Sequence, residues 1–353
     1  MNKEKFHNIH EDFTKTAFNN QDMLPDRYVF IITNLCNLKC DFCFQKKEPR
    51  KDAMSKESWL ELVNQLPDYS RVTLTGGEPL LYSGFDIIFS KIAKKFNCNI
   101  ISNGVLLTEK KIDFLLSFPK FKVLSISIDD IGNTVRGLTQ QQWNHVIKML
   151  KYFVKIRDEK NLDCVLDIKS TILDETASEM FNIYKYLREE LKCDTHSFNL
   201  LKGSPMQHAD HNYDFKDMFK KWEAPVYKKF NIIKKQLESV RQYNIDKGYI
   251  SFLHPKVDSL VSEKKIPDLD YINKSDHIKN NFLNCMYPWS SVHINVDGSV
   301  FPCMAIPMGN VKDAPLKEIF FGENYMKFKD TIRKEKTVEG CNRCGWLKPK
   351  NLR

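Results

Sequence analysis

The sequence predicts an α/β protein built on a parallel sheet, and three observations carry this prediction. Short apolar segments alternate with longer amphipathic segments between residues 28 and 201. The alternation then stops, and two clusters of cysteines lie near its start and near the end of the chain. Alternating strands and helices are typical of right-handed β-α-β crossovers, in which ligands gather at the carboxyl ends of the strands.

The alternating elements can be read in order along the chain. Residues 28–33, Tyr-Val-Phe-Ile-Ile-Thr, form a continuous apolar run that suits a strand buried on both faces. An amphipathic helix follows with Ser55 as its N-cap. Residues 71–75 form the next strand and run into Gly76-Gly77-Glu78-Pro79. The same pattern predicts helices at 84–96, 108–117, 140–156 and 176–190, and strands at 98–102, 122–128, 163–171 and 194–200.

Composition indicates a globular intracellular protein. The 353 residues are 42% hydrophobic and 12% aromatic, which is enough for a substantial core. We expect a cytoplasmic location and no membrane association, because there is no signal-peptide pattern at Met1 and no apolar run long enough for a bilayer. The net charge of +9 is scattered along the chain without a nucleic-acid-binding motif, so no nucleic-acid partner is expected.

The chain divides into four predicted regions. A lead-in segment at 1–27 is expected to lie on the core, and the alternating core covers 28–201. Residues 202–284 are predicted as a helical cover or linker with two amphipathic helices within 213–244. A small C-terminal domain at 285–353 is predicted to contain a β-hairpin that turns at Asp297-Gly298, followed by a helical segment at 315–334.

The first cysteine cluster is the loop after the first strand, where Cys36, Cys40 and Cys43 are spaced C-x3-C-x2-C. Three thiolates do not complete a closed zinc site or a four-iron cluster, since both take four protein ligands. One metal position is then open to a small molecule. The alternatives are a zinc site completed by a distant side chain and a chance group of buried thiols.

The second cluster consists of Cys285, Cys303, Cys341 and Cys344. The predicted hairpin can bring the first two together, and the chain returns to them through a terminal C-x2-C. On spacing alone, four thiolates suit a zinc ion and a four-iron cluster equally well. The remaining cysteines, at or near predicted strand starts, are expected to be small buried hydrophobic residues: Cys98, Cys164 and Cys193.

The C-x3-C-x2-C spacing with Phe42 before its third cysteine, together with the downstream Gly-Gly-Glu-Pro turn, resembles the radical S-adenosylmethionine (SAM) enzymes. This resemblance implies a partial (β/α)6 TIM barrel over residues 28–201. It also implies a [4Fe-4S] cluster on Cys36, Cys40 and Cys43 that binds SAM at its open iron. An external one-electron donor of flavodoxin or ferredoxin type then drives cleavage of SAM to a 5'-deoxyadenosyl radical, which abstracts a hydrogen from the substrate.

The order of the later cysteines resembles the twitch module, a shortened SPASM domain. The resemblance implies an auxiliary [4Fe-4S] cluster that Cys285, Cys303, Cys341 and Cys344 close with four ligands. Such a cluster is expected to be an electron relay or a structural staple. Zinc remains the alternative occupant.

The resemblance also implies contacts with SAM. The Gly-Gly turn would receive its amino group, Ser102-Asn103 would lie at its ribose, and Arg136 would pair with its carboxylate. Ser127 and Asp129, two residues apart, are predicted to face the barrel interior. The predicted cofactor-binding residues are Phe42, Gly76, Gly77, Glu78, Pro79, Ser102, Asn103, Ser127, Asp129 and Arg136.

For several other polar residues, the sequence is consistent with both a packing role and a functional role. These are Lys169, Ser170 and Asn199 on later strands, and His208-Ala-Asp210-His211, read as a solvated loop or as a metal or proton-donor site. No catalytic acid or base is assigned.

Three functions are consistent with these features. The first is a radical SAM oxidoreductase that oxidises a small molecule of sugar or aminocyclitol type with the auxiliary cluster as relay. The second is a ribosomal-peptide maturase that cross-links or epimerises its substrate. The third is a non-catalytic metal-binding scaffold, which predicts no SAM cleavage. A short precursor reading frame beside the gene would favour the peptide.

Overall fold

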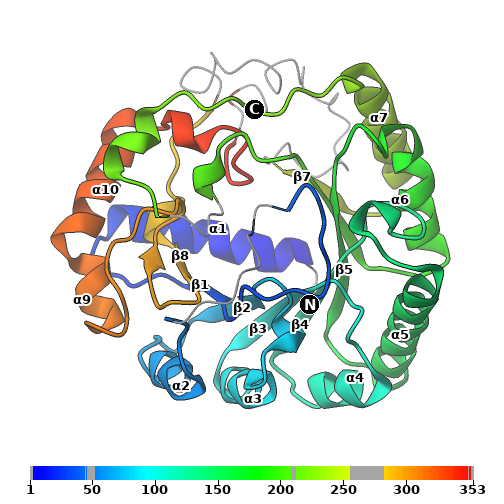
Figure 1. Ribbon diagram of the computed structural model, residues 1–353, viewed down its shortest axis with the longest axis horizontal. Coiled ribbons are helices and arrows are strands. Elements are labelled where there is room, and N and C mark those ends of the chain that lie inside the picture. The colour runs from blue at the N-terminus through cyan, green and yellow to red at the C-terminus, as the bar shows by residue number, and fades with distance from the viewer. Residues whose placement is uncertain are drawn as a thin grey trace.

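The computed structural model describes residues 3–43, 45, 52–207, 212–254, 282–348 and 350. Within these residues, nine strands form one sheet in the order β7-β6-β5-β4-β3-β2-β1-β8-β9. Neighbouring strands are parallel except for the antiparallel pair β8 and β9. Figure 1 shows the sheet curving around the centre of the molecule with helices α2 to α7 along its outside. The predicted α/β class is confirmed.

The predicted core elements are present, with their ends shifted by a few residues. The strands are β1 (Arg27–Ile31), β2 (Arg71–Thr75), β3 (Asn97–Ser102), β4 (Phe121–Ser127), β5 (Val165–Thr171) and β6 (Thr195–Asn199). The helices between them are α2 (Lys56–Asn64), α3 (Phe85–Lys95), α4 (Glu109–Leu116), α5 (Gln140–Glu159) and α6 (Met180–Glu189).

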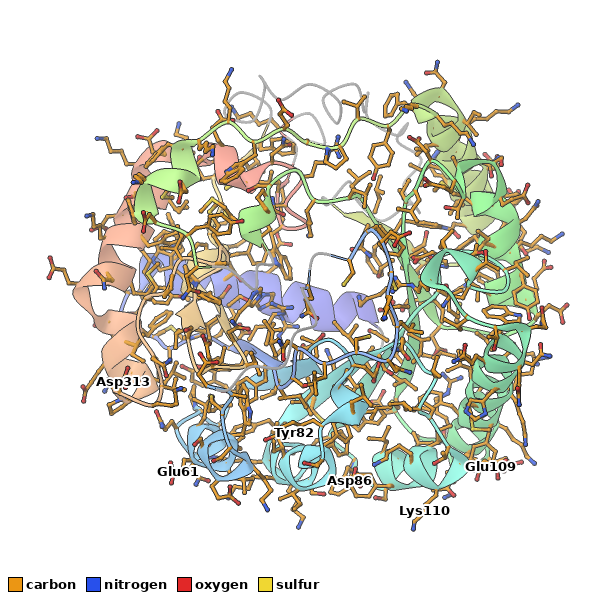
Figure 2. All side chains as sticks on the ribbon, viewed as in Figure 1. Glu61, Tyr82, Asp86, Glu109, Lys110 and Asp313 are labelled. Atoms are coloured by element: carbon orange, nitrogen blue, oxygen red, sulfur yellow. The ribbon has the colours of Figure 1, made fainter. Side chains whose placement is uncertain are left out.

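Capping residues and amphipathic faces explain where these helices begin and which side they bury. Ser55, Thr108 and Thr139 each accept a hydrogen bond from a backbone N–H in the first turn of the helix that follows. Their apolar stripes pack on the sheet, for example Ile88 and Phe89 of α3, both fully buried. Charged residues on the opposite faces point outward, as Figure 2 shows for Glu61, Asp86, Glu109 and Lys110.

The sheet is wider than the (β/α)6 unit that the resemblance implies. At one edge, β7 (Ser251–His254) pairs with β6, although the region 202–284 was predicted to be a helical cover. At the other edge, β8 (Ser291–Ile294) pairs with β1, and β9 (Val300–Phe301) completes the predicted hairpin. The C-terminal cysteines are therefore attached to the same sheet as the N-terminal cysteine loop.

The predicted pair of helices within 213–244 is only half correct. The second is α7 (Phe230–Lys247), whereas the first is a short 3-10 helix, Phe215–Phe219, followed by irregular chain. Hydrogen bonds to the chain that follows β5 hold the end of this irregular segment. The Tyr227 hydroxyl donates to the Ile172 carbonyl at 3.0 Å, and the Asp174 carboxylate accepts from the backbone N–H groups of Lys228 and Lys229. The predicted helix at 315–334 is also split, into α9 (Leu316–Phe321) and α10 (Glu323–Glu335), at Gly322.

The predicted lead-in segment contains a helix, α1 (Lys3–Asn19). His10 and Thr14, one turn apart, are buried and face the sheet. The His10 Nδ1 atom lies 2.9 Å from an Asp26 carboxylate oxygen, and the Thr14 Oγ1 atom lies 2.7 Å from Ser290 Oγ. Because Asp26 and Ser290 precede β1 and β8, α1 lies across the amino ends of these two strands and leaves their carboxyl ends open.

Candidate functional site

A cavity of about 870 Å³ lies at the carboxyl ends of the parallel strands. The last residue of each strand from β2 to β6 lines it: Thr75, Ser102, Ser127, Thr171 and Asn199. Residues 200–205 after β6, and His293 and Cys303 of the C-terminal part, also line the cavity. The edge of the sheet where ligands gather in such folds therefore forms a wall of this cavity.

The N-terminal cysteine loop brings all three of its thiols to this cavity. Cys36, Cys40 and Cys43 line it and are each partly exposed. The Leu38 backbone N–H donates to the Cys36 sulfur at 3.4 Å, and the Asn103 amide nitrogen lies 3.8 Å from the same sulfur. The loop thus presents three sulfur donors to one space, as the spacing predicted.

The Gly76-Gly77 turn is packed directly against the start of the cysteine loop. Gly77 N–H donates to the Thr33 carbonyl at 2.7 Å, and Glu78 N–H donates to the Leu35 carbonyl at 2.8 Å. A Cβ atom on Gly76 would overlap the Thr33 carbonyl oxygen, and one on Gly77 would overlap that of Leu35. Both positions require glycine, because the backbone of this turn packs directly against the backbone of the cysteine loop. Both also line the cavity.

Glu78 and Pro79 complete this turn and are buried, whereas Gly76 and Gly77 line the cavity, and a part for Glu78 and Pro79 in binding SAM stays a prediction. Glu78 is fully buried, and its carboxylate accepts from Leu80 N–H, Ser102 Oγ and Asn103 N–H at 2.8 to 3.1 Å. Burial raises the pKa of Glu78 to about 7, and these hydrogen bonds oppose the shift. Pro79 is buried and begins a short 3-10 helix, Pro79–Leu81. The structure gives Glu78 the role of joining the ends of β2 and β3.

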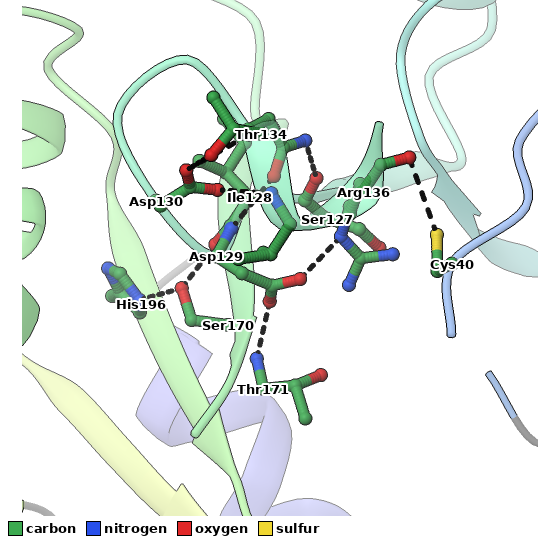
Figure 3. A network of polar contacts seen from close by, with 12 residues as sticks. Cys40, Ser127, Ile128, Asp129, Asp130, Thr134, Arg136, Ser170, Thr171 and His196 are labelled. Carbon is green, nitrogen blue, oxygen red and sulfur yellow. Dashed lines mark hydrogen bonds and ion pairs between the residues drawn. The ribbon is translucent and has the colours of Figure 1, made fainter. Parts of the chain in front are cut away.

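Arg136 lies beside the cysteine loop and is held by Asp129 (Figure 3). Its Nε atom lies 2.6 Å from the Asp129 carboxylate, and its guanidinium stands 5.2 Å from the centre of the Phe42 ring. Both Arg136 and Phe42 line the cavity. The Arg136 carbonyl also accepts a contact from the Cys40 sulfur at 3.9 Å. The loop that follows β4 and the cysteine loop are therefore joined.

Asp129 is a correction to the sequence prediction, because its side chain does not line the cavity with Ser127. β4 ends at Ser127, so the alternation of a strand no longer applies two residues later. The Asp129 carboxylate is buried, pairs with Arg136 and accepts from Thr171 N–H at 2.6 Å. Burial raises its pKa, and the charge of Arg136 opposes this shift. Asp129 therefore orients the Arg136 side chain from a buried position.

The remaining candidates divide between the cavity wall and the core. Ser102, Asn103, Ser127, Lys169 and Asn199 line the cavity. Ser170 is buried, with its hydroxyl on the Ile128 carbonyl and 2.8 Å from His196 Nε2, which is a packing role (Figure 3). The interpretation of Cys98, Cys164 and Cys193 as buried residues is confirmed. His208, Asp210 and His211 lie outside the described residues.

The four later cysteines come together on a second, small cavity. Cys285, Cys303, Cys341 and Cys344 all line it, and Cys303 lines the large cavity as well. Burial and the neighbouring Cys344 sulfur raise the pKa of Cys285 to about 12, and the pKa values of Cys303 and Cys341 are raised further by burial and by the other sulfurs. Thiols in this position favour the protonated form unless a metal compensates their charge.

Sequence reasoning missed the segment that positions the terminal C-x2-C. Residues 201–207, directly after β6, run beside it. Gly203 N–H donates to the Asn342 carbonyl at 3.2 Å, and a methyl group at Gly203 would lie 2.8 Å from that oxygen. The Gln207 amide donates to the carbonyls of Gly340 and Asn342. We call residues 201–207 the bridging segment. A lone Gly-Ser-Pro in an irregular stretch was its sole signal.

Both sites fit iron-sulfur clusters by their donor chemistry. One loop supplies three sulfurs at a cavity with room for a further ligand, and four cysteines, of which Cys341 is buried and the others are partly exposed, line the small cavity of the second site. Within the described residues, no three His, Cys, Asp or Glu side chains are gathered closely enough to hold a single metal ion.

The fold and the cysteine loop define the class of protein. The radical SAM superfamily matches residues 30–198, and SPASM, an iron-sulfur cluster-binding domain, matches residues 285–345. The chain therefore belongs to the radical SAM superfamily and is of its SPASM-domain type. These two domains imply S-adenosylmethionine and two [4Fe-4S] clusters as cofactors, as the sequence analysis expected.

Two curated relatives from Bacillus subtilis are similar over different lengths. The sporulation killing factor maturation protein SkfB is 29% identical over 164 residues, which cover 45% of this chain and 39% of SkfB. The antilisterial bacteriocin subtilosin biosynthesis protein AlbA is 20% identical over 317 residues, covering 86% of this chain and 61% of AlbA. The chain thus spans less than two thirds of either relative.

Solved structures share the fold at low sequence identity. Streptococcus suis SuiB bound to the precursor peptide SuiA matches with a TM-score of 0.61 and 16% identity, covering 92% of this chain and 71% of SuiB. The anSMEcpe structure with bound AdoMet and the Cp18Cys peptide matches with a TM-score of 0.57 and 19% identity, covering 91% of this chain and 86% of that one.

Among the described residues, no helix is long and apolar enough to cross a bilayer.

Proposed function

We propose that this radical SAM enzyme modifies a peptide substrate, in the manner of a ribosomal-peptide maturase. The observation that carries the proposal is the single cavity that reaches from the thiols of Cys36, Cys40 and Cys43 to Cys303 of the second site. A peptide side chain can enter this space between the two sites while the rest of the peptide stays outside. The relatives SkfB and AlbA are named for maturation and biosynthesis of peptides, and SuiB was solved with its precursor peptide.

This proposal reverses the order of the two enzyme functions in the sequence analysis. Oxidation of a sugar or aminocyclitol stands first there. The relatives favour the peptide alternative instead, since several are named for peptide products. A separate recognition protein can supply leader-peptide binding. For a cross-link, which is a net oxidation, we propose the second cluster as the electron acceptor, whereas epimerisation is redox-neutral for the peptide.

In the proposed arrangement, Cys36, Cys40 and Cys43 hold the SAM-binding cluster, and the four later cysteines hold the auxiliary cluster. Bound SAM and its cluster supply the hydrogen-abstracting chemistry. The residues of this chain would bind SAM and the cluster and orient them. The Gly76-Gly77 backbone and Arg136 line the cavity and would bind the amino acid part of SAM, and Asp129 fixes the arginine in one orientation.

The ends of the strands would hold the nucleoside part. Ser102 and Asn103 line the cavity, and both are fixed by the Glu78 carboxylate, so their polar groups keep one geometry. The Asn103 side chain also contacts Asn37 at 2.8 Å, which ties this end of the site to the cysteine loop. Preorganised polar groups of this kind lower the cost of binding.

The proposal is tested by co-expressing the enzyme with each short reading frame beside its gene and measuring the mass of the resulting peptide. Loss of two hydrogens indicates a cross-link, and incorporation of solvent deuterium without a mass change in ordinary water indicates epimerisation. The control is the variant Cys36→Ala/Cys40→Ala/Cys43→Ala, which should leave the peptide unmodified. A protein that releases 5'-deoxyadenosine after dithionite reduction, yet alters none of these peptides, contradicts the peptide proposal.

A further inference from the structure

The large cavity extends along β1 and β8 to Arg27, the first residue of β1. Arg27, Val29 and Ile31 alternate along β1, and all three line the cavity. On the neighbouring strand, Ser291 is in register with Arg27 and His293 with Val29, and His293 lines the cavity too. At about 3.3 Å per residue, Arg27 lies roughly 13 Å along the strand from Ile31. The cavity therefore has an end away from the cysteine loop, and Arg27 lines that end.

The Arg27 guanidinium is held in place by neutral groups. Its Nη1 atom donates to Ser291 Oγ at 2.8 Å, and its central carbon lies 5.1 Å from the centre of the Trp346 ring. Within the described part of the chain, no carboxylate forms an ion pair with it. An arginine has five N–H donors in a planar fork, so most of these donors remain for a ligand in the cavity.

Asp26, the residue before Arg27, is engaged elsewhere. Its carboxylate lies 2.9 Å from His10 Nδ1 and 3.8 Å from Arg71 Nε. Burial and the positive charge of Arg71 lower the pKa of Arg27 to about 9, and the charge of Asp26 opposes this shift. Arg27 is therefore still charged at neutral pH, but its charge is poorly compensated. A desolvated charge is costly unless an opposite charge pairs with it.

Other charged residues of the cavity differ from Arg27 in this respect. Arg136 and Lys169 each pair with a buried carboxylate, Asp129 at 2.6 Å and Asp167 at 3.1 Å. Among the described residues that line the cavity, Glu223 is the one with a carboxylate, and it is exposed and forms no ion pair. The guanidinium at the start of β1 is thus left for an anion from outside the protein.

We propose that Arg27 binds a carboxylate of the substrate at this end of the cavity, so that the enzyme selects a peptide with an acidic side chain or a free C-terminus there. A guanidinium recognises a carboxylate through two parallel N–H···O bonds. Lys202 lines the same cavity and adds positive charge to it. That the carboxylate belongs to a peptide rests on the proposed function, whereas the carboxylate site itself does not.

The test measures equilibrium binding of two pairs of small probes by ligand-observed NMR. N-acetyl-L-glutamate N-methylamide and its neutral glutamine counterpart represent an acidic side chain, and N-acetylglycylglycine and its amide represent a free C-terminus. The protein is reconstituted with iron and sulfide without oxygen, kept oxidised and saturated with SAM, so that Arg136 is not open to the probes. The parent protein should bind the charged member of one pair roughly tenfold more tightly than the neutral member.

Variants of Arg27 connect this preference to the guanidinium. Arg27→Gln should abolish the preference, and Arg27→Lys, which keeps the charge without the fork, should retain part of it. The matched control is Arg333→Gln. The Arg333 guanidinium also stands over a tryptophan, 5.2 Å from the centre of the Trp289 ring, but Arg333 is not among the described residues that line the cavity. Its loss should leave the preference unchanged.

His293 allows a second test in which Arg27 stays. His293→Glu places a carboxylate on β8, two residues along the strand from the serine that contacts Arg27, so the protein itself supplies the missing partner. The charged probe should then lose its advantage. His293→Gln has nearly the same size as His293→Glu without the charge and should keep the preference. Iron content is measured in every variant.

A parent protein that binds both members of each pair equally overturns the proposal. An Arg27→Gln protein with full iron content that keeps the preference also overturns it. If Arg27→Gln does not take up its clusters, the His293 variants decide, and equal preference in His293→Glu and His293→Gln overturns the proposal. The peptide proposal fails on a different result, the absence of any modified peptide, so the two failures are distinguishable.

Discussion

The two cysteine sites differ in how the chain builds them. The first is local: Cys36, Cys40 and Cys43 lie on one loop after β1, are partly exposed and face the large cavity. The second is assembled from distant parts of the sequence, with Cys285 before β8, Cys303 after β9 and the terminal pair at 341 and 344. The comparison teaches that an open site can be made by a short loop, whereas a closed site with four ligands needs tertiary structure.

Removing the first site should have the largest effect. In the variant Cys36→Ala/Cys40→Ala/Cys43→Ala we expect SAM cleavage to fall to background and iron content to fall by about four atoms per chain. The measurement is 5'-deoxyadenosine release together with iron and sulfide analysis. Because the three thiols are on a loop at the cavity wall, the melting temperature should change little. Retention of SAM cleavage would break the distinction between the sites.

Removing the second site should lower the melting temperature and abolish the peptide product, whereas SAM cleavage should persist. Cys285→Ala/Cys341→Ala takes ligands from two distant segments, so about four irons are lost and the cluster no longer ties the terminal C-x2-C to the segments beside β8 and β9. We expect a clear drop in melting temperature, loss of peptide product, and SAM cleavage within roughly tenfold of the parent protein. If SAM cleavage disappeared along with the auxiliary cluster, the two sites could not be assigned separate roles.

Gly77→Ala should damage the first site without touching the second. The added Cβ overlaps the Leu35 carbonyl oxygen, so the cysteine loop must shift, at a cost of about 1 to 3 kcal/mol. Anaerobic reconstitution should give lower iron content and SAM cleavage, with the auxiliary EPR signal intact. Gly248→Ala is the control for backbone strain alone, because Gly248 has a positive φ of 66° but open space around it. Equal effects of the two changes would refute the packing argument.

Arg136→Lys should weaken SAM binding by roughly tenfold, because lysine cannot reproduce the two-pronged contact with a carboxylate. Equilibrium binding of SAM to the reconstituted protein measures this. Arg241→Lys, in an ion pair with Glu238 on α7 at 3.0 Å, is the matched control and should bind SAM normally. Unchanged affinity in Arg136→Lys would remove this arginine from the proposed SAM site.

The smallest effect is a pH dependence at Glu78. Its pKa is raised from 4.5 to about 7, so the folded protein holds a proton that the unfolded chain releases. Between about pH 4.5 and pH 7 the Glu78 contribution to stability should therefore fall as pH rises. Melting temperatures of the apoprotein across this range measure the slope, and Glu78→Gln should flatten it by an amount on the order of 1–3 kcal/mol over the window. Parallel slopes in the two proteins would contradict the assignment.

Local pattern was enough to predict the core and the first site. The period of the apolar residues located β1 to β6 and the helices between them, and the tight spacing of Cys36, Cys40 and Cys43 on one loop required them to meet. Neither inference needed knowledge of distant contacts.

What sequence could not predict depends on contacts between distant segments. The pairing of β7 with β6 and of β8 with β1 has no local signal, because strand pairing is set by the whole fold. Asp129 was expected to face the barrel interior with Ser127, and Glu78 belongs to the turn that was expected to contact SAM. Each follows the end of a strand, where alternation no longer tells which way a side chain points, and both proved to be buried supports. The bridging segment has no periodicity at all, so its contact with the terminal cysteines required the structure.

The most direct test of the account is the EPR spectrum of the dithionite-reduced protein with and without SAM. The account predicts signals from two clusters, of which one changes when SAM is added. That signal should be absent from Cys36→Ala/Cys40→Ala/Cys43→Ala, and the remaining signal should not respond to SAM. A response of the remaining signal to SAM, or a protein in which neither signal responds, would contradict the assignment of the open site to the N-terminal loop.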